Sequence, residues 1–362
     1  YVTIREFAGE KVFAAAAFMP PGYIRTLHSA YEQLPVAPRL PLYCYAAVGW
    51  SGGKFYVAGR RIDRRVHHSI ADSDLPRIDA AARAMRNQYR SNRLVEHLVC
   101  NCVFKYRCPN ACNFVLGRRE CPIPVSTGCN ASCIGCISKQ PKSSGFSSSQ
   151  HRLDFVPTVK EIVEYVVPHL KTAAQPIASF GQGCEGEPLL KAPLIEEAIT
   201  EIRAGTKRGV ININTNAGLP GAVEGLCKAG LNSMRVSLNS AQPEYYHAYY
   251  KPKGYGFNDV MESILVAKRH KAWVSLNYLV FPGFTDFPSE TAALKKLLRR
   301  TGVDMIQTRN LNIDPQWFYT VMGLKEVKER PIGMTQWIDG MRKEFPQVRL
   351  GYLNPAIKNC LR

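Results

Sequence analysis

Short apolar segments alternate with segments of helical periodicity along the chain from residue 122 onward. The apolar segments have the length of single β-strands and fall at residues 123–126, 177–180, 210–214, 234–238, 274–279 and 305–308. The first helix is predicted to begin at Thr158-Val159-Lys160-Glu161, a capping box, and later helices at 194–203, 222–229, 259–269, 289–300 and 335–345. These repeats predict an α/β fold, a partial (β/α)6 TIM-type barrel whose chemistry lies at the carboxyl ends of its strands.

The region before the barrel has a mixed pattern. It contains a strand-like segment at 12–18, a glycine-punctuated hairpin around 50–57 and a helix start at Asp74-Leu75-Pro76. We therefore expect four parts. They are an N-terminal α+β domain at 1–98, a cysteine-rich segment at 99–121, the barrel at 122–315 and a C-terminal helix and strand extension at 316–362.

Composition excludes a disordered or fibrous chain, because 46% of the 362 residues are hydrophobic. The sequence has no apolar run of about 20 residues, which argues against a membrane-spanning helix. The net charge of +18 favours an anionic partner. Residues 60–119 hold 13 Lys and Arg against 5 Asp and Glu, so this stretch is either a solvated helix face or an anion-binding surface.

Cysteines are unevenly distributed. Eight of the 12 lie between residues 100 and 136, and only Cys44, Cys184, Cys227 and Cys360 lie elsewhere, without a predicted role. A chain of this length with regular strand and helix patterns is unlike a secreted disulfide scaffold. The cysteines therefore indicate metal or cluster ligation in a reducing compartment, and we expect a cytoplasmic location.

Three of these cysteines form a CxxxCxxC loop directly after the first predicted strand. Cys129, Cys133 and Cys136 can bind three irons of a [4Fe–4S] cluster and leave the fourth iron open to another ligand. The alternative is a zinc loop, but zinc sites usually pair their cysteines and close with a fourth ligand.

This loop, together with the four strand ends that follow, resembles the radical S-adenosylmethionine (radical SAM) superfamily over residues 121–312. The matching segments are Glu185-Gly186-Glu187-Pro188, Asn214-Thr215-Asn216, Arg235-Val236-Ser237-Leu238-Asn239-Ser240 and Tyr278-Leu279-Val280-Phe281-Pro282-Gly283. Two positions depart from the family pattern. Glu185 replaces its first glycine, and Gly135 replaces an aromatic residue.

The resemblance implies S-adenosylmethionine (SAM) and a [4Fe–4S] cluster as cofactors, with a reductant such as flavodoxin or ferredoxin. In this family one electron from the cluster cleaves SAM, and the resulting 5′-deoxyadenosyl radical abstracts hydrogen from a substrate. The residues that it implies as SAM contacts are Gly186, Glu187, Thr215, Asn216, Ser237, Asn239, Val280 and Pro282.

Five further cysteines precede the barrel: Cys100, Cys102, Cys108, Cys112 and Cys121. Four of them can bind a second [4Fe–4S] cluster, which the nearby basic residues would balance in charge, or a zinc ion. An N-terminal auxiliary cluster resembles the layout of sulfur-inserting radical SAM enzymes, so sulfur insertion is one alternative function. A zinc-dependent nucleic-acid-binding module is the alternative from another class.

Substrate contacts are predicted beyond the sixth strand, at Arg309, Asn310 and Asn312, unless these residues form a plain turn. The net charge points to a large or anionic substrate, such as RNA, a protein or peptide, or an anionic lipid. A tyrosine-rich loop at 245–255 either stacks a base or sugar or packs between domains. His67-His68 is interpreted as surface or interface structure. The sequence does not predict an oligomeric state.

Overall fold

The computed structural model describes residues 6–11, 16–17, 19–28, 35–42, 46–64, 70–324, 327–354 and 357. Its main sheet has seven parallel strands in the order β14-β13-β12-β11-β10-β9-β8. The strands are β8 (Glu120–Ile123), β9 (Ile177–Phe180), β10 (Val210–Thr215), β11 (Ser233–Leu238), β12 (Trp273–Val280), β13 (Met305–Asn310) and β14 (Arg349–Gly351). The predicted α/β fold, consistent with a partial TIM-type barrel, is thereby confirmed.

The observed strands differ from the predicted ones at the two edges of the sheet. The first ends at Ile123 instead of continuing to Ser126, because Val125 and Ser126 donate their N–H groups to a carboxylate rather than to a neighbouring strand. β14, which the sequence pattern did not resolve as a strand of this sheet, pairs with β13 at its outer edge.

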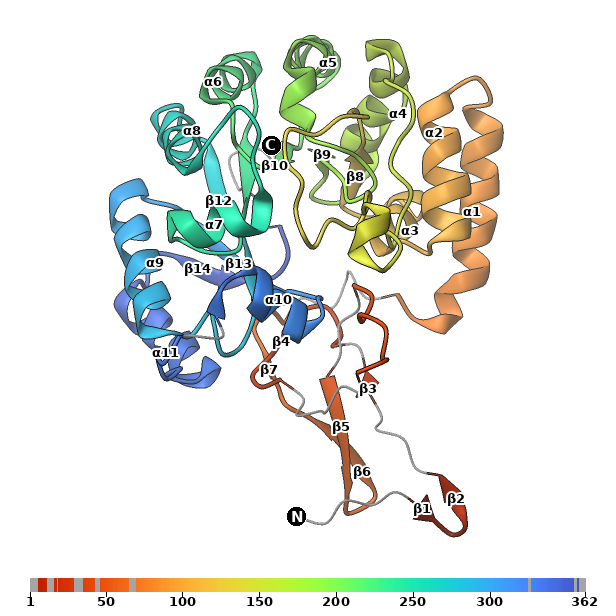
Figure 1. The fold of residues 1–362 in the computed structure, drawn as a ribbon. Helices are drawn as coiled ribbons and strands as arrows, with labels where there is room; N and C mark the ends of the chain where they lie inside the picture. Colours follow the sequence, from red (N-terminus) through yellow and green to blue (C-terminus); the bar gives the residue numbers. More distant parts are fainter. Residues whose placement is uncertain are drawn as a thin grey trace.

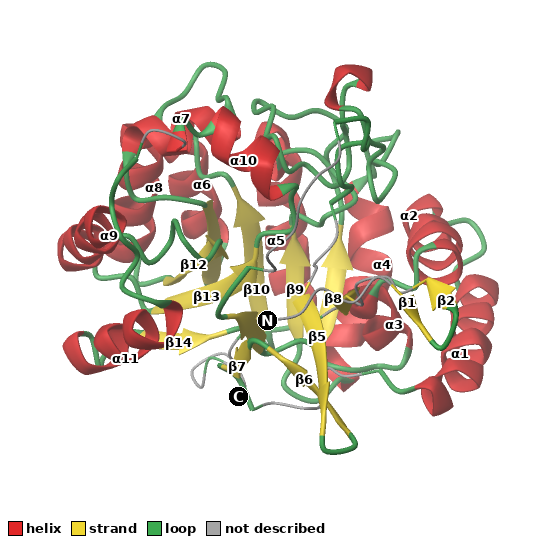
Figure 2. Cartoon of the chain, turned by 60° about the horizontal axis from the view of Figure 1, so that its bottom comes forward, coloured by secondary structure: helices red, strands yellow, loops and turns green. Residues whose placement is uncertain are grey.

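Helices cover the outside of the strands (Figure 1). These outer helices are α4 (Val159–Thr172), α5 (Ala192–Gly205), α6 (Pro220–Ala229), α8 (Phe257–Arg269), α9 (Pro288–Thr301) and α11 (Met334–Glu344). Two shorter helices, α7 (Pro243–Tyr250) and α10 (Pro315–Val321), lie instead at the carboxyl ends of the strands (Figure 2). The capping box of α4 is confirmed, with Thr158 Oγ1 accepting from Glu161 N–H at 3.2 Å and Glu161 accepting from Thr158 N–H at 2.8 Å. Among the described residues, none of the helices has the length and hydrophobicity that crossing a membrane requires.

Near the carboxyl ends of β10 to β13, the side chains that point into the barrel are mostly polar. Asn214 lies opposite Arg235 in the strand register, and Ser237 lies opposite Asn277. Because side chains along a strand alternate between faces, these residues share the inward face with Arg309, and together they line two adjoining cavities. The interior therefore offers hydrogen-bonding groups to a ligand.

Two types of structure precede the barrel. One type consists of small antiparallel pairs, of which the hairpin β5 (Ala46–Ser51) and β6 (Lys54–Val57) projects away from the barrel (Figure 2). The remaining short strands are β1 (Glu6–Phe7), β2 (Glu10–Lys11), β3 (Ala16–Ala17), β4 (Tyr23–Arg25) and β7 (Gly59–Arg61). Of the predicted strand 12–18, only 16–17 is among the described residues. His67, His68, Cys44 and Cys360 lie outside them.

A helical group packs beside β8, at the right of Figure 1. It consists of α1 (Leu75–Gln88), α2 (Arg93–His97), the π-helical segment η2 (Leu98–Lys105) and α3 (Pro109–Val115). Arg93 on α2 binds both carboxylate oxygens of Glu161 at 2.7 and 2.8 Å. Asn92 Nδ2 donates to Glu161 O at 2.8 Å. The start of α4 is thus also the attachment point of α2.

We predict that Glu161→Ala lowers the free energy of unfolding by about 1 kcal/mol, because it removes the capping partner of Thr158. Glu161→Gln should cost less, since glutamine keeps the capping geometry and loses only the pairing with Arg93. Urea unfolding under anaerobic conditions, followed by circular dichroism, measures both changes.

The difference in free energy of unfolding between the wild type and Glu161→Gln should depend on pH. Pairing with Arg93 lowers the pKa of Glu161 from 4.5 to about 2. A carboxylate whose pKa is lower in the folded state stabilises the protein above its ordinary pKa, and this contribution is lost as the pH falls from 4.5 towards 2. The difference in free energy of unfolding between the wild type and Glu161→Gln should therefore become smaller as the pH is lowered from 6 to 4, by roughly a few tenths of a kcal/mol. A gap that does not change with pH contradicts this assignment.

Candidate active site at the carboxyl end of the barrel

The CxxxCxxC loop follows β8 at the carboxyl edge of the sheet. Cys129, Cys133 and Cys136 are free thiols that line a cavity of about 320 Å³. The wall of this cavity also contains five of the predicted SAM contacts: Gly186, Glu187, Thr215, Asn216 and Ser237. The structure thus brings together the loop and the ends of β9, β10 and β11, which lie up to about a hundred residues apart in the sequence.

The segment after β9 holds the cysteine loop by backbone contacts. Gly186 N–H donates to Ser126 O and Glu187 N–H donates to Gly128 O, each at 2.8 Å. A Cβ atom on Gly186 would overlap the carbonyl oxygen of Gly128. Only glycine permits this approach, so the Gly186 predicted from the sequence has a steric reason in the structure.

Helix α7 holds the same loop from the other side. Ser132 N–H donates to Tyr250 O at 2.9 Å, and Ile134 N–H donates to Tyr249 O at 3.0 Å. A Cβ atom on Gly135 would overlap the hydroxyl of Tyr249. The space that an aromatic residue between the second and third cysteines would need is therefore occupied by Tyr249. Tyr249 and Tyr250 also line the cavity, so the two interpretations of the tyrosine-rich segment stay predictions.

Glu187 organises the end of β10. Its carboxylate accepts from Leu189 N–H at 3.0 Å, from Asn216 N–H at 2.8 Å and from the Thr215 hydroxyl at 2.5 Å. Burial raises the pKa of Glu187 to about 7. Asn216 in turn donates from Nδ2 to Asn130 Oδ1 at 2.7 Å, inside the cysteine loop. Hydrogen bonds of the Glu187 carboxylate and of Asn216 therefore connect the residues expected near SAM to the cysteine loop.

Glu185, which replaces the family's first glycine, also has a structural role. It accepts from Val125 N–H at 2.7 Å, Ser126 N–H at 2.9 Å and Gln182 N–H at 2.5 Å. Burial raises the pKa of Glu185 to about 8. Its carboxyl group thus accepts hydrogen bonds from the backbone where β8 ends and the cysteine loop begins.

The other predicted SAM contacts are not in the wall of this cavity. Asn239 Nδ2 donates to Tyr245 O at 3.2 Å, and Val280 is fully buried. Pro282 also lies outside the wall, to which β12 contributes Asn277 and Leu279. The strand was predicted correctly, but the alternation of its side chains places Leu279 on the inward face.

The predicted substrate residues have different environments. Arg309 lines a second cavity of about 430 Å³ and stacks on Tyr352, with its guanidinium carbon 3.9 Å from the ring centroid. Asn310 is engaged by β4, since its Oδ1 accepts from Arg25 N–H at 2.8 Å and its Nδ2 donates to Tyr23 O at 3.0 Å. Asn312 Oδ1 is buried without a hydrogen-bond partner among the described residues.

The five upstream cysteines are not gathered around one point. The Cys100 thiol donates to Glu96 at 3.2 Å. Cys112 lies one helical turn after Cys108 on α3, and Cys121 is completely buried within β8. Cys102 instead lies beside Cys184. The second cluster and the sulfur insertion that depends on it stay predictions.

The structure also pairs much of the basic stretch that precedes the barrel. Arg86, Arg107 and Arg118 form ion pairs with Glu96, Asp79 and Asp74, respectively. These arginines are therefore engaged by carboxylates, which favours the solvated helix face over an anion-binding surface.

Comparison with known proteins agrees with the site. Residues 123–294, which include the cysteine loop and the ends of β8 to β12, match the radical SAM superfamily as a sequence family. This chain therefore carries a radical SAM domain at residues 123–294. The cofactors of that family are SAM and a [4Fe–4S] cluster, and a zinc-binding nucleic-acid module does not account for the match.

One curated relative is the GTP 3′,8-cyclase of Aquifex aeolicus (strain VF5), 28% identical over 227 residues. The match spans 62% of this chain and 64% of the relative. Among solved structures, methylornithine synthase (PylB) has a TM-score of 0.45 at 16% identity, over 79% of this chain and 72% of that one. The solved structure of native anSMEcpe with bound AdoMet has a TM-score of 0.46 at 17% identity, over 64% of each chain.

The radical SAM site fits its cofactors in three respects. Its three cysteines are unpaired and share one cavity. Arg152 Nη2 donates to Cys136 Sγ at 3.6 Å, an arrangement that stabilises a thiolate. A network of buried polar groups from β9 and β10 faces the same cavity.

We predict that Gly186→Ala prevents assembly of the cluster, because the added methyl group must displace the backbone at Gly128. Most of the iron should be lost after anaerobic reconstitution, as measured by iron and sulfide analysis. Gly221→Ala is the matched control, since a Cβ atom at Gly221 on α6 meets nothing within 4 Å. Equal iron contents in the two variants would contradict the requirement for glycine at position 186.

Proposed function

We propose that this protein is a radical SAM enzyme that cleaves SAM reductively and abstracts hydrogen from an anionic substrate. The observation that supports this most directly is the single cavity shared by Cys129, Cys133 and Cys136 with Glu187 and Asn216. When bound, the cluster supplies the electron that cleaves SAM to methionine and the 5′-deoxyadenosyl radical, which takes a hydrogen atom from the substrate.

The protein's own residues bind the cluster and orient SAM beside it. The three cysteines bind the cluster, and Arg152 stabilises the negative charge at Cys136. Glu187 fixes the backbone at Asn216 and the side chain of Thr215, so this part of the cavity wall is rigid before SAM enters. Strand-end residues of β9, β10 and β11 form the cavity wall, so bound SAM would displace water from the space beside the cysteines.

Two arginines support an anionic substrate. Arg235 and Arg309 line the same 430 Å³ cavity, and Arg235 also lines the cavity that contains the cysteines. Burial, followed by repulsion from Arg309, lowers the pKa of Arg235 to about 10. An anionic group bound between them would relieve both effects. The name of the A. aeolicus relative, GTP 3′,8-cyclase, identifies an anionic nucleotide for that protein.

The net charge of +18 is the further basis for this substrate class. The predicted substrate classes are still RNA, a protein or peptide, and an anionic lipid.

Charge also supports an acidic electron donor of the flavodoxin or ferredoxin type. A third cavity, of about 770 Å³, reaches the cysteine loop and is lined by several cations: Arg39, Lys139, Arg152, Lys251 and Lys253. Complementary charge accelerates the encounter of redox partners. We include a cytoplasmic location in the proposal, because a reducing compartment keeps the cysteines available for the cluster.

We expect the reconstituted protein to form 5′-deoxyadenosine from SAM when reduced with dithionite under anaerobic conditions. Cys133→Ser should abolish this product, because the cluster loses one of its three ligands. Cys227→Ser, at a cysteine on α6 that lines none of these three cavities, should retain it. Liquid chromatography with mass detection measures the product. A wild type that contains an intact cluster and SAM but forms no 5′-deoxyadenosine overturns the proposed function.

The substrate class is tested separately with inorganic tripolyphosphate as an anionic probe. Calorimetric titration of the SAM-loaded protein should detect binding that Arg309→Gln weakens roughly tenfold, the usual effect of losing one charge-assisted hydrogen bond. Arg300→Gln, at an exposed arginine on α9, is the matched control and should bind like the wild type. Absence of binding, or equal binding by all three proteins, contradicts an anionic subsite at Arg309.

A further inference from the structure

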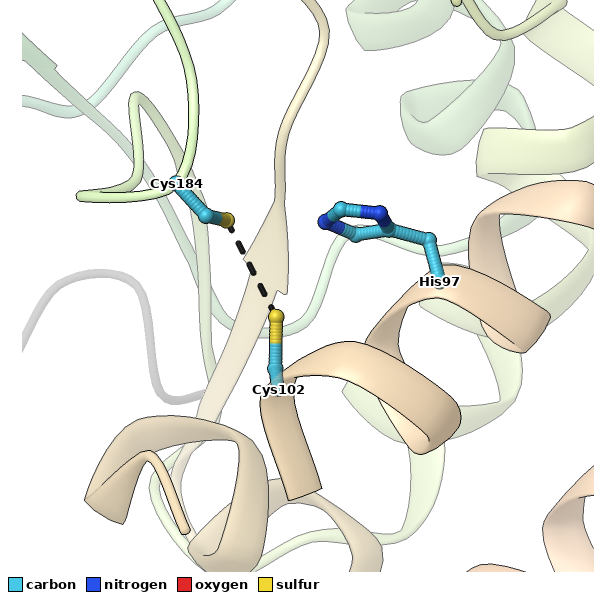
Figure 3. A group of neighbouring side chains, drawn as sticks. All are labelled: His97, Cys102 and Cys184. Carbon is cyan, nitrogen blue, oxygen red and sulfur yellow. Dashed lines mark hydrogen bonds between the residues drawn. The ribbon is translucent and has the colours of Figure 1, made fainter. Parts of the chain in front are cut away.

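Three buried side chains outside the SAM site meet between the helical group and the barrel. They are His97 at the end of α2, Cys102 on η2 and Cys184 on the loop after β9 (Figure 3). Their ligand atoms, one imidazole nitrogen and two sulfurs, all lie within 4.8 Å of one another. Among the described side chains, this is the one group of three or more histidine, cysteine and acidic residues that meets this distance.

The distance between the sulfurs suits a single metal ion. Cys102 Sγ and Cys184 Sγ are 3.9 Å apart. Two thiolates that are each about 2.3 Å from a tetrahedral zinc ion are separated by about 3.8 Å. The imidazole is turned towards the sulfurs in Figure 3, and its Nε2 atom is buried without a hydrogen-bond partner among the described residues. A buried nitrogen without a partner is costly, and a metal ion would satisfy it.

The second ring nitrogen of His97 also has the environment of a metal ligand. Nδ1 lies 3.2 Å from the side-chain amide of Asn101. A histidine that binds metal through Nε2 typically donates its Nδ1–H to such a partner. The amide of Asn101 needs only to present its oxygen, since the two ends of an asparagine amide are interchangeable by a flip.

Charge balance is favourable for a divalent ion. Two thiolates and a neutral imidazole neutralise a 2+ charge, so the buried site has no net charge. The neighbouring Cys102 sulfur and burial raise the pKa of Cys184 well above its ordinary value. Cys184 is therefore a neutral thiol without the ion, and binding of the ion releases its proton.

A route for the ion and a position for a fourth ligand are also present. Cys102 and Cys184 line the 430 Å³ cavity, and so does Cys108. The fourth tetrahedral position would be taken by a solvent molecule from this cavity or by Cys108, whose thiol lies outside the group of ligand atoms within 4.8 Å of one another. Cys108 N–H donates to Cys102 O at 2.8 Å, which keeps the two cysteines together in the helical group.

We propose that His97, Cys102 and Cys184 bind a single zinc ion in a tetrahedral site distinct from the radical SAM cluster. The ion links the helical group to the loop after β9, because Cys184 immediately precedes the segment of Glu185, Gly186 and Glu187. This inference does not depend on the proposed radical chemistry.

The site differs from a second [4Fe–4S] cluster in its ligands and in its spacing. Four irons and four sulfides lie between the thiolates of such a cluster and hold them further apart than one ion does. A zinc site also uses His97 and Cys184, which no prediction from the sequence included. Metal analysis therefore separates the two possibilities.

The test is metal analysis by mass spectrometry of protein produced with both iron and zinc in the medium and purified anaerobically. We expect one zinc and four irons per chain. Cys102→Ser should lose most of the zinc and keep the four irons, whereas Cys129→Ser should lose the iron and keep the zinc. Cys112→Ser, at another buried cysteine of the helical group, is the matched control and should keep both metals.

Two results overturn the proposal. One is a wild type without stoichiometric zinc. The other is a chain with about eight irons, of which about four are lost in both Cys102→Ser and Cys112→Ser, since that pattern indicates the second cluster.

A spectroscopic measurement on the wild type covers the case in which a variant does not fold. Zinc K-edge absorption should show two or three sulfurs at about 2.3 Å and a nitrogen at about 2.0 Å. Three sulfurs assign the fourth position to Cys108, and two assign it to solvent. A shell of oxygen and nitrogen atoms only indicates zinc bound elsewhere and contradicts the site.

Discussion

The cysteine loop has no regular secondary structure, so its conformation is set by the segments that pack against it. The closest of these contacts is the approach of Gly186 to the carbonyl of Gly128, where no Cβ atom fits. Two backbone hydrogen bonds accompany this approach, and the end of α7 supplies two more on the other side. The thiols can face one cavity only while both segments stay in place. The position of the cluster ligands is therefore a property of the whole carboxyl edge of the barrel.

Buried carboxyl groups are the second feature of this edge. Glu185 and Glu187 are both desolvated, yet each accepts three hydrogen bonds from N–H or O–H groups of neighbouring loops. Burial alone favours the neutral acids, while the hydrogen bonds favour the carboxylates. Such groups are costly to place in a core and are typical of functional sites. Here they order backbone segments that have no strand or helix partners, which leaves the thiols and the inward polar residues free for ligands.

The helical group before the barrel reaches the same edge by a different route. Arg93 and Asn92 attach α2 to the first turn of α4, and His97 and Cys102 meet Cys184 on the loop after β9. A zinc ion at this point would fix the helical group to the segment that holds the cysteine loop. Two metal centres with different chemistry would then share one structural element, the loop of residues 181–187.

The sequence determined the barrel, the capping box of α4 and the CxxxCxxC loop, because each depends on neighbours within a few residues: strand length, helical spacing, or a cap and its partner. It also indicated Gly186, Glu187, Thr215, Asn216 and Ser237, since parallel strands bring their carboxyl ends to one edge. Tertiary structure alone decided which residue of β12 faces the cavity, why Gly135 is not aromatic, and that Asn310 is engaged by β4. The same holds for His97 and Cys184, which are 87 positions apart in the sequence. Their proximity depends on how a helix packs against a loop, and no local pattern records such packing.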